Sequence, residues 1–370
     1  MGKIGYLFKR ITSMSYKSFF ETIDFVHKQN GKNKVFIFFD IVHCGLKYQA
    51  GYMDYKLFEM YNQNEKQRAT VVTRGINNAL VKKYNDPAYN YLLDDKIEFN
   101  KKFNKYLMRD WMKITNTEEN FNDFKEFCKK HKEIIVKPID ESCGKGVEKL
   151  KVTDKNAKEI YDNLWETKRY LVEEVAVQCK EISRLHPNSI NTIRIVTLNN
   201  VIVQAFLRIG NKGNVVDNFN HDGLVAPINI ETGIIDYPAI AKKGGIFEKH
   251  PMTGEDILWF QIPKWPRIKR YIERAAKEVP QVRYVGWDVC LGEKDPCLIE
   301  GNPFPGHDLY QLPPHRTNGM GVLPRFKEAM NRKEDENEDS NSNWSSRCWR
   351  KKTNNGGIER QIWINWQESC

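Results

Sequence analysis

The stretch YVGWDVCLGEKDPCLIEGNPFPG, residues 284–306, decides the fold of this chain. It predicts a strand around Asp288, a Lys-Asp-Pro turn, and a second strand that leads into Glu300 and Asn302. If these two strands pair, Asp288 approaches Glu300 and Asn302 at one end of a hairpin. The stretch therefore predicts a cluster of oxygen-bearing side chains at the edge of a sheet.

The three polar residues of this hairpin have the chemistry of a metal site. Two carboxylates and one amide offer only oxygen atoms, which suit Mg²⁺ or Mn²⁺ better than zinc. Acidic residues at strand ends are usually solvated, which is the simpler interpretation. Here the acids interrupt apolar strands and run directly into Asn-Pro-Phe-Pro-Gly. We therefore predict that Asp288, Glu300 and Asn302 bind magnesium, and that other residues hold a phosphate group.

Composition indicates a soluble globular protein of the cytoplasm. A chain of 370 residues with 40% hydrophobic content can bury a core in two or three lobes. No run of about eighteen apolar residues occurs, so no membrane span is expected, and residues 1–10 lack the apolar core of a signal peptide. Tyr6 stands where a myristoylation signal has Ser or Thr. The eight cysteines form no CxxC pair, which is typical of reduced thiols.

The net charge of +10 fits nucleic acid, an anionic membrane surface or a polyphosphate substrate. The chain has no recognisable nucleic-acid-binding motif, and its basic residues are spread along the whole sequence. We therefore expect no nucleic-acid partner.

The first part of the chain has helical periodicity. Apolar residues recur at helical spacing in three segments, 14–29, 53–62 and 77–84. Gly31 offers a stop for the first of them. The short run 35–41 fits a buried strand or a helical turn, and we favour helix. The segment 94–114 also reads as helix, with Phe99, Phe103 and Leu107 on one face.

The middle of the chain predicts a lysine-ended strand and a glycine loop. Residues 133–138 form an apolar strand ending in Lys137-Pro, and residues 147–152 resemble its partner strand. Between them, Gly144 and Gly146 let the backbone turn sharply and present N–H groups to an anion, while Lys145 adds charge. The spacing is not that of a Walker loop. An ordinary hairpin loop fits equally well, but Lys137 needs an anionic partner if it points inward.

The next segments predict a strand and a hairpin, and the hairpin carries two arginines, Arg194 and Arg208. Residues 170–175 read as a strand, and residues 195–198 and 201–209 as a hairpin across Asn199-Asn200. Asn191 and Arg194 flank the start of this hairpin and are candidates to face one site, while a surface hairpin with exposed arginines is the alternative. A strand at 224–230 and an amphipathic helix at 265–279 follow.

Taken together, these motifs resemble the ATP-grasp superfamily. Their order is strand-Lys137-Pro, Gly-Lys-Gly, Leu-Val-Glu-Glu, Asn-Thr-x-Arg, Trp-Asp and Glu-x-Asn-x-x-Pro-Gly. From about residue 40 to 311 the chain is most similar to the sugar-transfer-associated ATP-grasp family, which is related to α-L-glutamate ligases. The resemblance implies an α+β fold, in which two lobes enclose ATP behind a mostly helical N-terminal part.

The resemblance also implies a domain order. Residues 1–94 would be the helical cap, residues 95–175 the small lobe with the glycine loop, and residues 176–330 the large lobe with the metal site. Residues 331–370 are charged and then rich in Ser, Asn and Trp, without periodicity, and we predict a disordered tail there.

The family's roles transfer to this chain by motif. Lys137 would touch the α- and β-phosphates, and the loop Ser142, Gly144, Lys145 and Gly146 would cover them. Either Lys96 or Lys101 would be the earlier nucleotide lysine. The adenine hinge would consist of Glu173, Glu174 and Val175, largely through backbone groups, and Glu181 would hold the ribose. Asp288, Glu300 and Asn302 would bind the metal ions.

The resemblance implies an ATP- and Mg²⁺-dependent ligase that joins a carboxylate to an amine or thiol through an acyl phosphate. Arg194 or Arg208 would stabilise the charge that develops in both steps. The partners would be small molecules, sugar-linked or belonging to the cell envelope. Phosphotransfer to a hydroxyl and a non-catalytic nucleotide-binding module are the alternatives.

Overall fold

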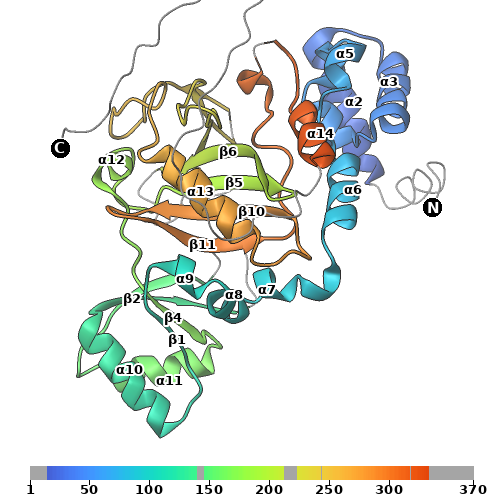
Figure 1. Cartoon of the computed structure of the whole chain (residues 1–370). Helices are drawn as coiled ribbons and strands as arrows, with labels where there is room; N and C mark the ends of the chain where they lie inside the picture. The colour runs from blue at the N-terminus through green and yellow to red at the C-terminus, as the bar shows by residue number, and fades with distance from the viewer. Residues whose placement is uncertain (1–14, 140–145, 212–222, 243, 317, 333–370) are drawn as a thin grey trace, which may run out of the picture. The chain divides into compact units, whose positions relative to one another are not determined.

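The computed structural model describes residues 15–139, 146–211, 223–242, 244–316 and 318–332. The chain divides into residues 1–332 and residues 333–370, and the second unit lies outside the described residues. The predicted tail therefore falls almost entirely outside them, as do residues 140–145 of the glycine loop. The described part combines helices with two antiparallel sheets, which confirms the predicted α+β class (Figure 1).

The larger sheet has seven antiparallel strands in the order β11-β10-β5-β6-β7-β8-β9. Its strands are β5 (Ile193–Leu198), β6 (Val201–Ile209), β7 (Leu224–Pro227), β8 (Ala239–Ala241), β9 (Ile246–Phe247), β10 (Tyr284–Leu291) and β11 (Pro296–Asn302). The β5–β6 hairpin is confirmed, and both turn residues, Asn199 and Asn200, have positive φ (53° and 63°). Asparagine tolerates this conformation, which the tight hairpin turn requires.

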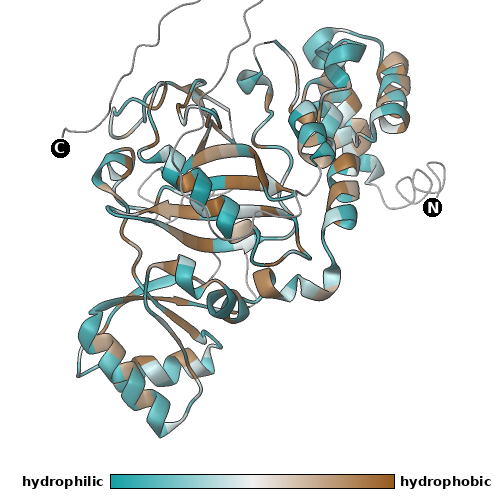
Figure 2. Ribbon diagram, in the orientation of Figure 1, coloured by the Kyte–Doolittle hydropathy of each residue, from teal (hydrophilic) through white to brown (hydrophobic). Residues whose placement is uncertain are grey.

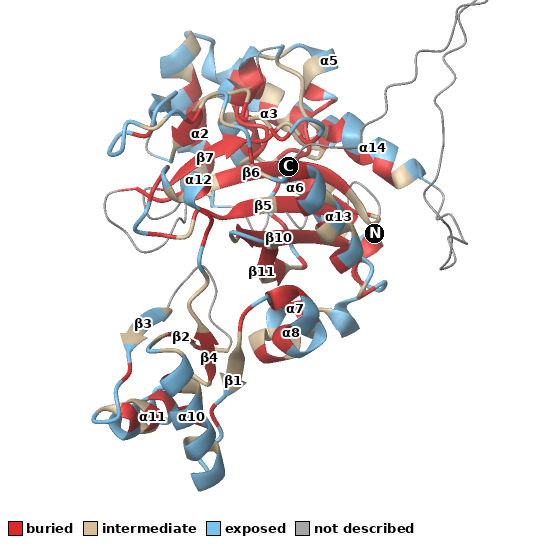
Figure 3. Cartoon of the chain, turned by 60° about the vertical axis from the view of Figure 1, so that its left-hand side comes forward, coloured by how far each residue is buried: buried red, intermediate tan, exposed pale blue. Residues whose placement is uncertain are grey.

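Side-chain alternation divides this sheet into two different faces. One face packs against helix α13 (Trp265–Ala276) and buries the strand residues Ile195, Val285 and Trp287. The central strands β10 and β6 are almost wholly buried, as the red colour in Figure 3 shows. On the opposite face, helix α14 (Leu323–Asn331) covers the end of the sheet that carries Val196 and Tyr284. Asp288 of β10 and Arg194 of β5 lie on this second face, opposite each other in the strand register.

The smaller sheet has four antiparallel strands in the order β1-β4-β2-β3. They are β1 (Trp111–Lys113), β2 (Glu133–Lys137), β3 (Glu148–Lys151) and β4 (Leu171–Glu174). Helices α10 (Glu118–Lys130) and α11 (Ala157–Glu166) pack on one side of it, and their buried residues share a core with the strands (Figure 1). The predicted strand pair around the glycine loop is confirmed, since β2 pairs with β3.

The N-terminal part is helical, as predicted, and has a core of its own. Its elements are α2 (Tyr16–Asn30), α3 (Lys34–Tyr48), α4 (Tyr52–Leu57), the 3₁₀ helix η1 (Met60–Asn62), α5 (Glu65–Arg68) and α6 (Arg74–Tyr84). Gly31 ends α2 with φ 69°, and the short run 35–41 is indeed helical. Apolar residues are frequent along α3, as the brown colour in Figure 2 shows. None of the described helices has the length and apolar character needed to span a bilayer.

Short elements connect these parts. They are η2 (Pro87–Tyr89), α7 (Tyr91–Asp94), α8 (Lys96–Lys102), α9 (Asn104–Leu107), α12 (Lys180–Ser183) and η4 (Pro313–His315). The predicted helix 94–114 is wrong beyond Leu107, because Met108 adopts a left-handed conformation (φ 50°) and the chain then enters β1. The predicted helix 53–62 is likewise broken at Glu59 (φ 48°). The predicted strand 224–230 ends earlier, at Pro227.

Candidate active site

The β10–β11 hairpin brings its acidic residues together. Asp288 lies opposite Glu300 in the strand register, and Gly286 lies opposite Asn302. Because side chains alternate along a strand, these positions share one face of the sheet. The pairing of the two strands is therefore confirmed, and it places the two carboxylates side by side on the face that α13 does not cover.

Two arginines meet Asp288 on this face. Arg194 of β5 is the register partner of Asp288, and its guanidinium makes two contacts with the carboxylate, one of them from Nη2 to Oδ2 at 2.8 Å. Arg208 of β6 donates from Nη1 to the same Oδ2 at 3.1 Å. Only 13% and 17% of these arginine side chains are exposed, so the alternative of a surface hairpin with exposed arginines is wrong.

The two carboxylates have opposite electrostatic environments. Burial disfavours the charged form of Asp288, yet the charges of Arg194 and Arg208 outweigh it and hold the pKa of Asp288 well below its usual range. Burial and the facing Asp288 carboxylate raise the pKa of Glu300 to about 7, although part of the Glu300 side chain reaches solvent. A cation placed between the two carboxylates would relieve this repulsion. The oxygen donors therefore fit a hard divalent ion.

Asn302 is the third predicted metal-binding residue. Its Oδ1 accepts a hydrogen bond from the backbone N–H of Phe304 at 2.8 Å. This bond shapes the turn into the Pro-Phe-Pro-Gly segment and orients the amide. The structure thus places Asn302 on the same face as the two carboxylates, at the end of β11.

On the smaller sheet, Lys137 contacts an anionic side chain, as the sequence predicts for a lysine that points inward. Its Nζ lies 2.5 Å from Oε2 of Glu173, which is only 2% exposed. The other oxygen of Glu173 accepts from Arg109 Nη2 and from Asn100 Nδ2, both at 2.8 Å. Burial opposes ionisation of Glu173, but the charges of Arg109 and Lys137 hold its pKa well below the usual range. The Glu173 side chain therefore lies in a buried ion cluster, and its backbone belongs to β4.

Arg109 was not singled out by the sequence. It is buried between the two sheets, where it also donates to the carbonyl of Leu298 on β11 and lies 3.2 Å from Sγ of Cys297. One guanidinium thus connects Glu173 on the small sheet with the strand that carries Glu300. Its partners are 64 and 189 residues away, so no local sequence signal marks it.

The structure distinguishes the two candidate nucleotide lysines. Lys96 Nζ donates to the carbonyl of Ile139 at 3.2 Å, directly before the undescribed loop residues. Lys101 is exposed and pairs with Glu98 at 2.8 Å. Lys96, rather than Lys101, is thus brought to the base of the glycine loop.

Most of the predicted glycine loop, namely Ser142, Gly144 and Lys145, lies outside the described residues. Gly146 is described and has φ 67°. A Cβ there would come within 3.0 Å of Pro138 Cγ. Both observations favour glycine at this position.

The remaining predicted nucleotide residues lie at the end of β4 and after it. Glu174 accepts from the backbone N–H of Asp110 at 3.0 Å and lies 3.7 Å from His131, so its side chain faces α10. Val175 is half-buried in the connection to α12. Glu181 is exposed in the first turn of α12, and a hydrogen bond to its own backbone lowers its pKa. The structure does not bring Glu181 into contact with the carboxylate pair.

Asn191 is fully buried rather than facing a site. Its Nδ2 donates to Gln178 Oε1 at 3.1 Å and to the carbonyl of His186 at 3.0 Å, while its Oδ1 accepts from the N–H of Gly210 at 3.2 Å. These bonds tie the connection after β4 to the ends of β5 and β6. Asn191 therefore orders the backbone around the site, which the sequence alone did not reveal.

The N-terminal helices hold the segment that follows Asn302. Asn77 of α6 donates to the carbonyl of Pro305 at 3.1 Å, and Asn85 donates to that of Pro303 at 2.6 Å. His307 Nε2 lies 2.9 Å from Asp54 Oδ1, and both side chains are buried. The helical part is therefore directly attached to the wall of the site.

Comparison with known proteins gives one family and several solved structures. None of the curated proteins matches the chain in sequence. The ATP-grasp ligase PsnB, solved with a minimal precursor, is 13% identical with a TM-score of 0.40, over 67% of this chain and 63% of that chain. The chain thus spans less than two thirds of PsnB. D-alanine–D-alanine ligase from Bacillus anthracis is 14% identical with a TM-score of 0.41, over 69% and 73%. D-cycloserine synthetase DcsG is 12% identical with a TM-score of 0.39, over 66% and 71%.

The family model described as sugar-transfer associated ATP-grasp matches residues 75–331. This match begins later than the predicted residue 40 and ends later than residue 311. It contains both sheets, the carboxylate pair and Lys137, and the predicted ATP-grasp fold is confirmed. Since the match covers well over half of the chain, the chain belongs to the sugar-transfer associated ATP-grasp family.

Proposed function

We propose that the protein is an ATP- and Mg²⁺-dependent ligase that joins a carboxylate to an amine or a thiol. The observation that carries the proposal is the carboxylate pair Asp288 and Glu300, which faces Arg194 and Arg208 on one face of the larger sheet. An acidic pair beside buried arginines suits a reaction in which several anions must approach one another.

The nucleotide would lie between the two sheets. Lys137 and Lys96 would neutralise its phosphates from the small-sheet side, and Gly146 with Ser142, Gly144 and Lys145 would cover them through backbone N–H groups. Glu173, Glu174 and Val175 would contribute backbone groups to the adenine, and Glu181 a carboxylate to the ribose. The position of Lys137 supports this placement, because it ends β2 just before the glycine loop.

Asp288, Glu300 and Asn302 would hold Mg²⁺, which when bound supplies positive charge that offsets the phosphate groups. Burial raises the pKa of Glu300 and the facing Asp288 carboxylate raises it further, so a cation bound between them would favour the ionised form, which supports this assignment. Arg194 keeps Asp288 ionised and lies 3.9 Å from Glu300.

In the first step, an oxygen of the substrate carboxylate attacks the γ-phosphorus of ATP, and the bond to the β-phosphate oxygen breaks. ADP leaves and an acyl phosphate forms. An amine or thiol then attacks the acyl carbon, phosphate departs with the bonding electrons, and the nucleophile loses its proton. Arg194 and Arg208 would stabilise the negative charge that develops in both steps. Water must be excluded, because an acyl phosphate hydrolyses.

The family's association with sugar transfer leads us to infer a sugar-linked substrate of cell-envelope synthesis. We place the reaction in the cytoplasm, where ATP is available. We also retain the predicted domain order, residues 1–94, 95–175, 176–330 and 331–370. The separate cores of residues 19–71 and of the small sheet fall within its first two parts, whereas Phe99, Phe103 and Leu107 pack into the core of the large sheet.

Hydroxylamine trapping tests the proposal. With ATP, Mg²⁺ and candidate sugar acids, the wild type should yield a hydroxamate together with ADP, because hydroxylamine captures an acyl phosphate. Asp288→Asn and Glu300→Gln should lower the rate by at least about a hundredfold. Glu126→Gln, a change in an exposed residue of α10, serves as the matched control and should match the wild type.

Other results of this experiment would assign a different function or contradict the site. A stable phosphate ester without hydroxamate would make the protein a phosphotransferase to a hydroxyl. Nucleotide binding without phosphate release from any acceptor would make it a non-catalytic module. Equal rates for wild type, Asp288→Asn and Glu300→Gln would contradict the assignment of the carboxylate pair.

A further inference from the structure

Helix α3 has two opposite apolar stripes. Ile37, Ile41, Cys44 and Tyr48 follow helical spacing and are buried in the N-terminal core. Val35, Phe39 and Leu46 also follow helical spacing, about half a turn around the helix, and they are 64%, 64% and 48% exposed. A helix that is apolar on two opposite sides needs a partner for each side. Among the described residues, the N-terminal core covers the stripe of Ile37, Ile41, Cys44 and Tyr48, while Val35, Phe39 and Leu46 stay exposed.

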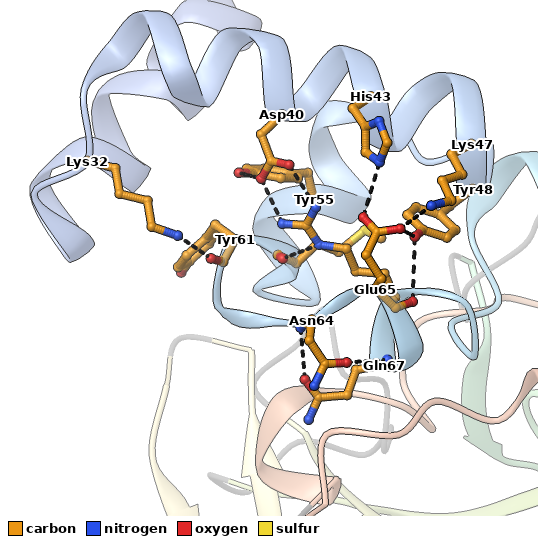
Figure 4. A network of polar contacts seen from close by, with 12 residues as sticks. Lys32, Asp40, His43, Lys47, Tyr48, Tyr55, Tyr61, Asn64, Glu65 and Gln67 are labelled. Carbon is orange, nitrogen blue, oxygen red and sulfur yellow. Dashed lines mark hydrogen bonds and ion pairs between the residues drawn. The ribbon is translucent and has the colours of Figure 1, made fainter.

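The polar side of α3 is used within the N-terminal part. Asp40 forms a two-bonded ion pair with Arg68, with both N···O distances at 2.7 Å, and accepts from the Tyr55 hydroxyl at 2.6 Å. His43 and Lys47 both reach Glu65 (Figure 4). These contacts fix the rotation of α3 about its axis. The stripe of Val35, Phe39 and Leu46 is therefore held away from the core.

The exposed stripe continues across neighbouring rings. Phe20 of α2 is 57% exposed and contacts Phe19 with ring centroids 5.6 Å apart. Phe19 in turn contacts Phe38 at 5.8 Å, and Phe38 contacts Phe39 at 5.4 Å. We define the outer apolar face by its exposed residues, Phe20, Val35, Phe38, Phe39 and Leu46. An exposed apolar face of this kind marks an interaction site.

The charges around this face are mainly positive. The span from Tyr16 to Leu57 contains six lysines, at positions 17, 28, 32, 34, 47 and 56. Its acidic residues are Glu21, Asp24, Asp40 and Asp54, and the last two are buried in pairs with Arg68 and His307. Lys17 and Lys34 pair with Glu21 and Asp24, and Lys47 pairs with the exposed Glu65 just beyond this span. Six lysines thus stand against three exposed carboxylates, which leaves the surroundings of the face positive. A second copy of the chain would bring the same positive charge to the face, whereas an anionic lipid surface would complement it.

We propose that α2 and α3 dock on an anionic lipid bilayer through the outer apolar face. Aromatic and aliphatic side chains would enter the boundary between head groups and acyl chains, and the lysines would contact lipid phosphates. The 15 residues of α3 reach about 22 Å, which is less than the roughly 30 Å of a hydrocarbon core, so the helix would lie in the membrane surface. This inference is independent of the proposed ligase activity.

Vesicle co-sedimentation of the full-length protein tests the proposal. Wild type should sediment with vesicles of phosphatidylcholine and phosphatidylglycerol, but not with phosphatidylcholine alone. The double change Phe39→Ser and Leu46→Ser should lower the partition coefficient by about tenfold. The matched control, Trp259→Ser with Ile246→Ser, removes two apolar residues that are 69% and 61% exposed elsewhere and should bind as wild type does.

Both double variants should melt near the wild-type temperature, because all four side chains are exposed. Absence of wild-type binding to the anionic vesicles would overturn the proposal. Undiminished binding of the Phe39 and Leu46 variant would place the contact elsewhere, for instance in residues 1–14. A dimer that this variant dissociates, without vesicle binding, would assign the face to a second copy.

Discussion

At the residue scale, the buried carboxylate of Glu173 binds three other side chains at once. Lys137, Arg109 and Asn100 all contact it in a buried environment. Glu173→Gln would leave two cations without their buried counter-charge, and we expect it to lower the free energy of unfolding by about 3 kcal/mol. Denaturant unfolding measures the change. Glu133→Gln, in the exposed part of the adjacent strand β2, should change stability by less than about 1 kcal/mol. Equal stability of the two variants would contradict the buried cluster.

A second residue-scale prediction concerns pH. Burial lowers the pKa of His315 to about 4, and its Nε2 lies 3.2 Å from the carbonyl of Pro238. In the unfolded chain His315 binds a proton below about pH 6.5, whereas in the folded chain it stays neutral down to about pH 4. The stability that neutral His315 contributes is therefore fully present above pH 6.5 and is lost as the pH falls toward 4. His315 should contribute a loss of about 2 kcal/mol between pH 7 and pH 5.

The measurement compares wild type and His315→Gln by denaturant unfolding at both pH values. The variant should lose less stability on acidification, since glutamine keeps a donor for Pro238 and does not titrate. Burial also lowers the pKa values of His186 and His250, so part of the loss should remain in the variant. Identical acid losses in the two proteins would contradict the assignment.

At the scale of elements, the end of α2 gives a clean test of backbone strain. Gly31 has φ 69°, and a Cβ there would have no heavy atom within 4 Å. Gly31→Ala should therefore cost about 1 kcal/mol through the left-handed conformation alone. Gly31→Asn should cost less, because asparagine tolerates this conformation better. Unfolding free energies of the two variants check this order, and a neutral alanine would contradict it.

The elements also show what the sequence can predict. The β10–β11 hairpin was predictable because two apolar runs flank a strong turn, and alternation then places Asp288 near Glu300. β1 was missed, since its three residues continue an apolar pattern at helical spacing, although the helix is interrupted at Phe103 and ends before Met108. The roles of Arg109 and Asn191 were not predictable. Their partners come from distant parts of the chain, and only the packed structure brings them together.

At the scale of the whole molecule, the helical N-terminal part contacts the proposed ligase site and also carries the proposed membrane-binding face. Through Asn77, Asn85 and Asp54 it holds the segment after the carboxylate pair, and on its other side it carries the outer apolar face. An enzyme attached to a bilayer in this way would meet lipid-linked substrates close to the membrane.

The central claim is that Asp288 and Glu300 bind the metal ion of a Mg-nucleotide held by Lys137. Calorimetric titration with a non-hydrolysable ATP analogue, with Mg²⁺ and with EDTA, tests it most directly. We predict that Mg²⁺ tightens binding to the wild type by at least about tenfold, and that Glu300→Gln abolishes this gain while retaining the metal-free affinity. An equal gain from Mg²⁺ in wild type and Glu300→Gln would contradict the account.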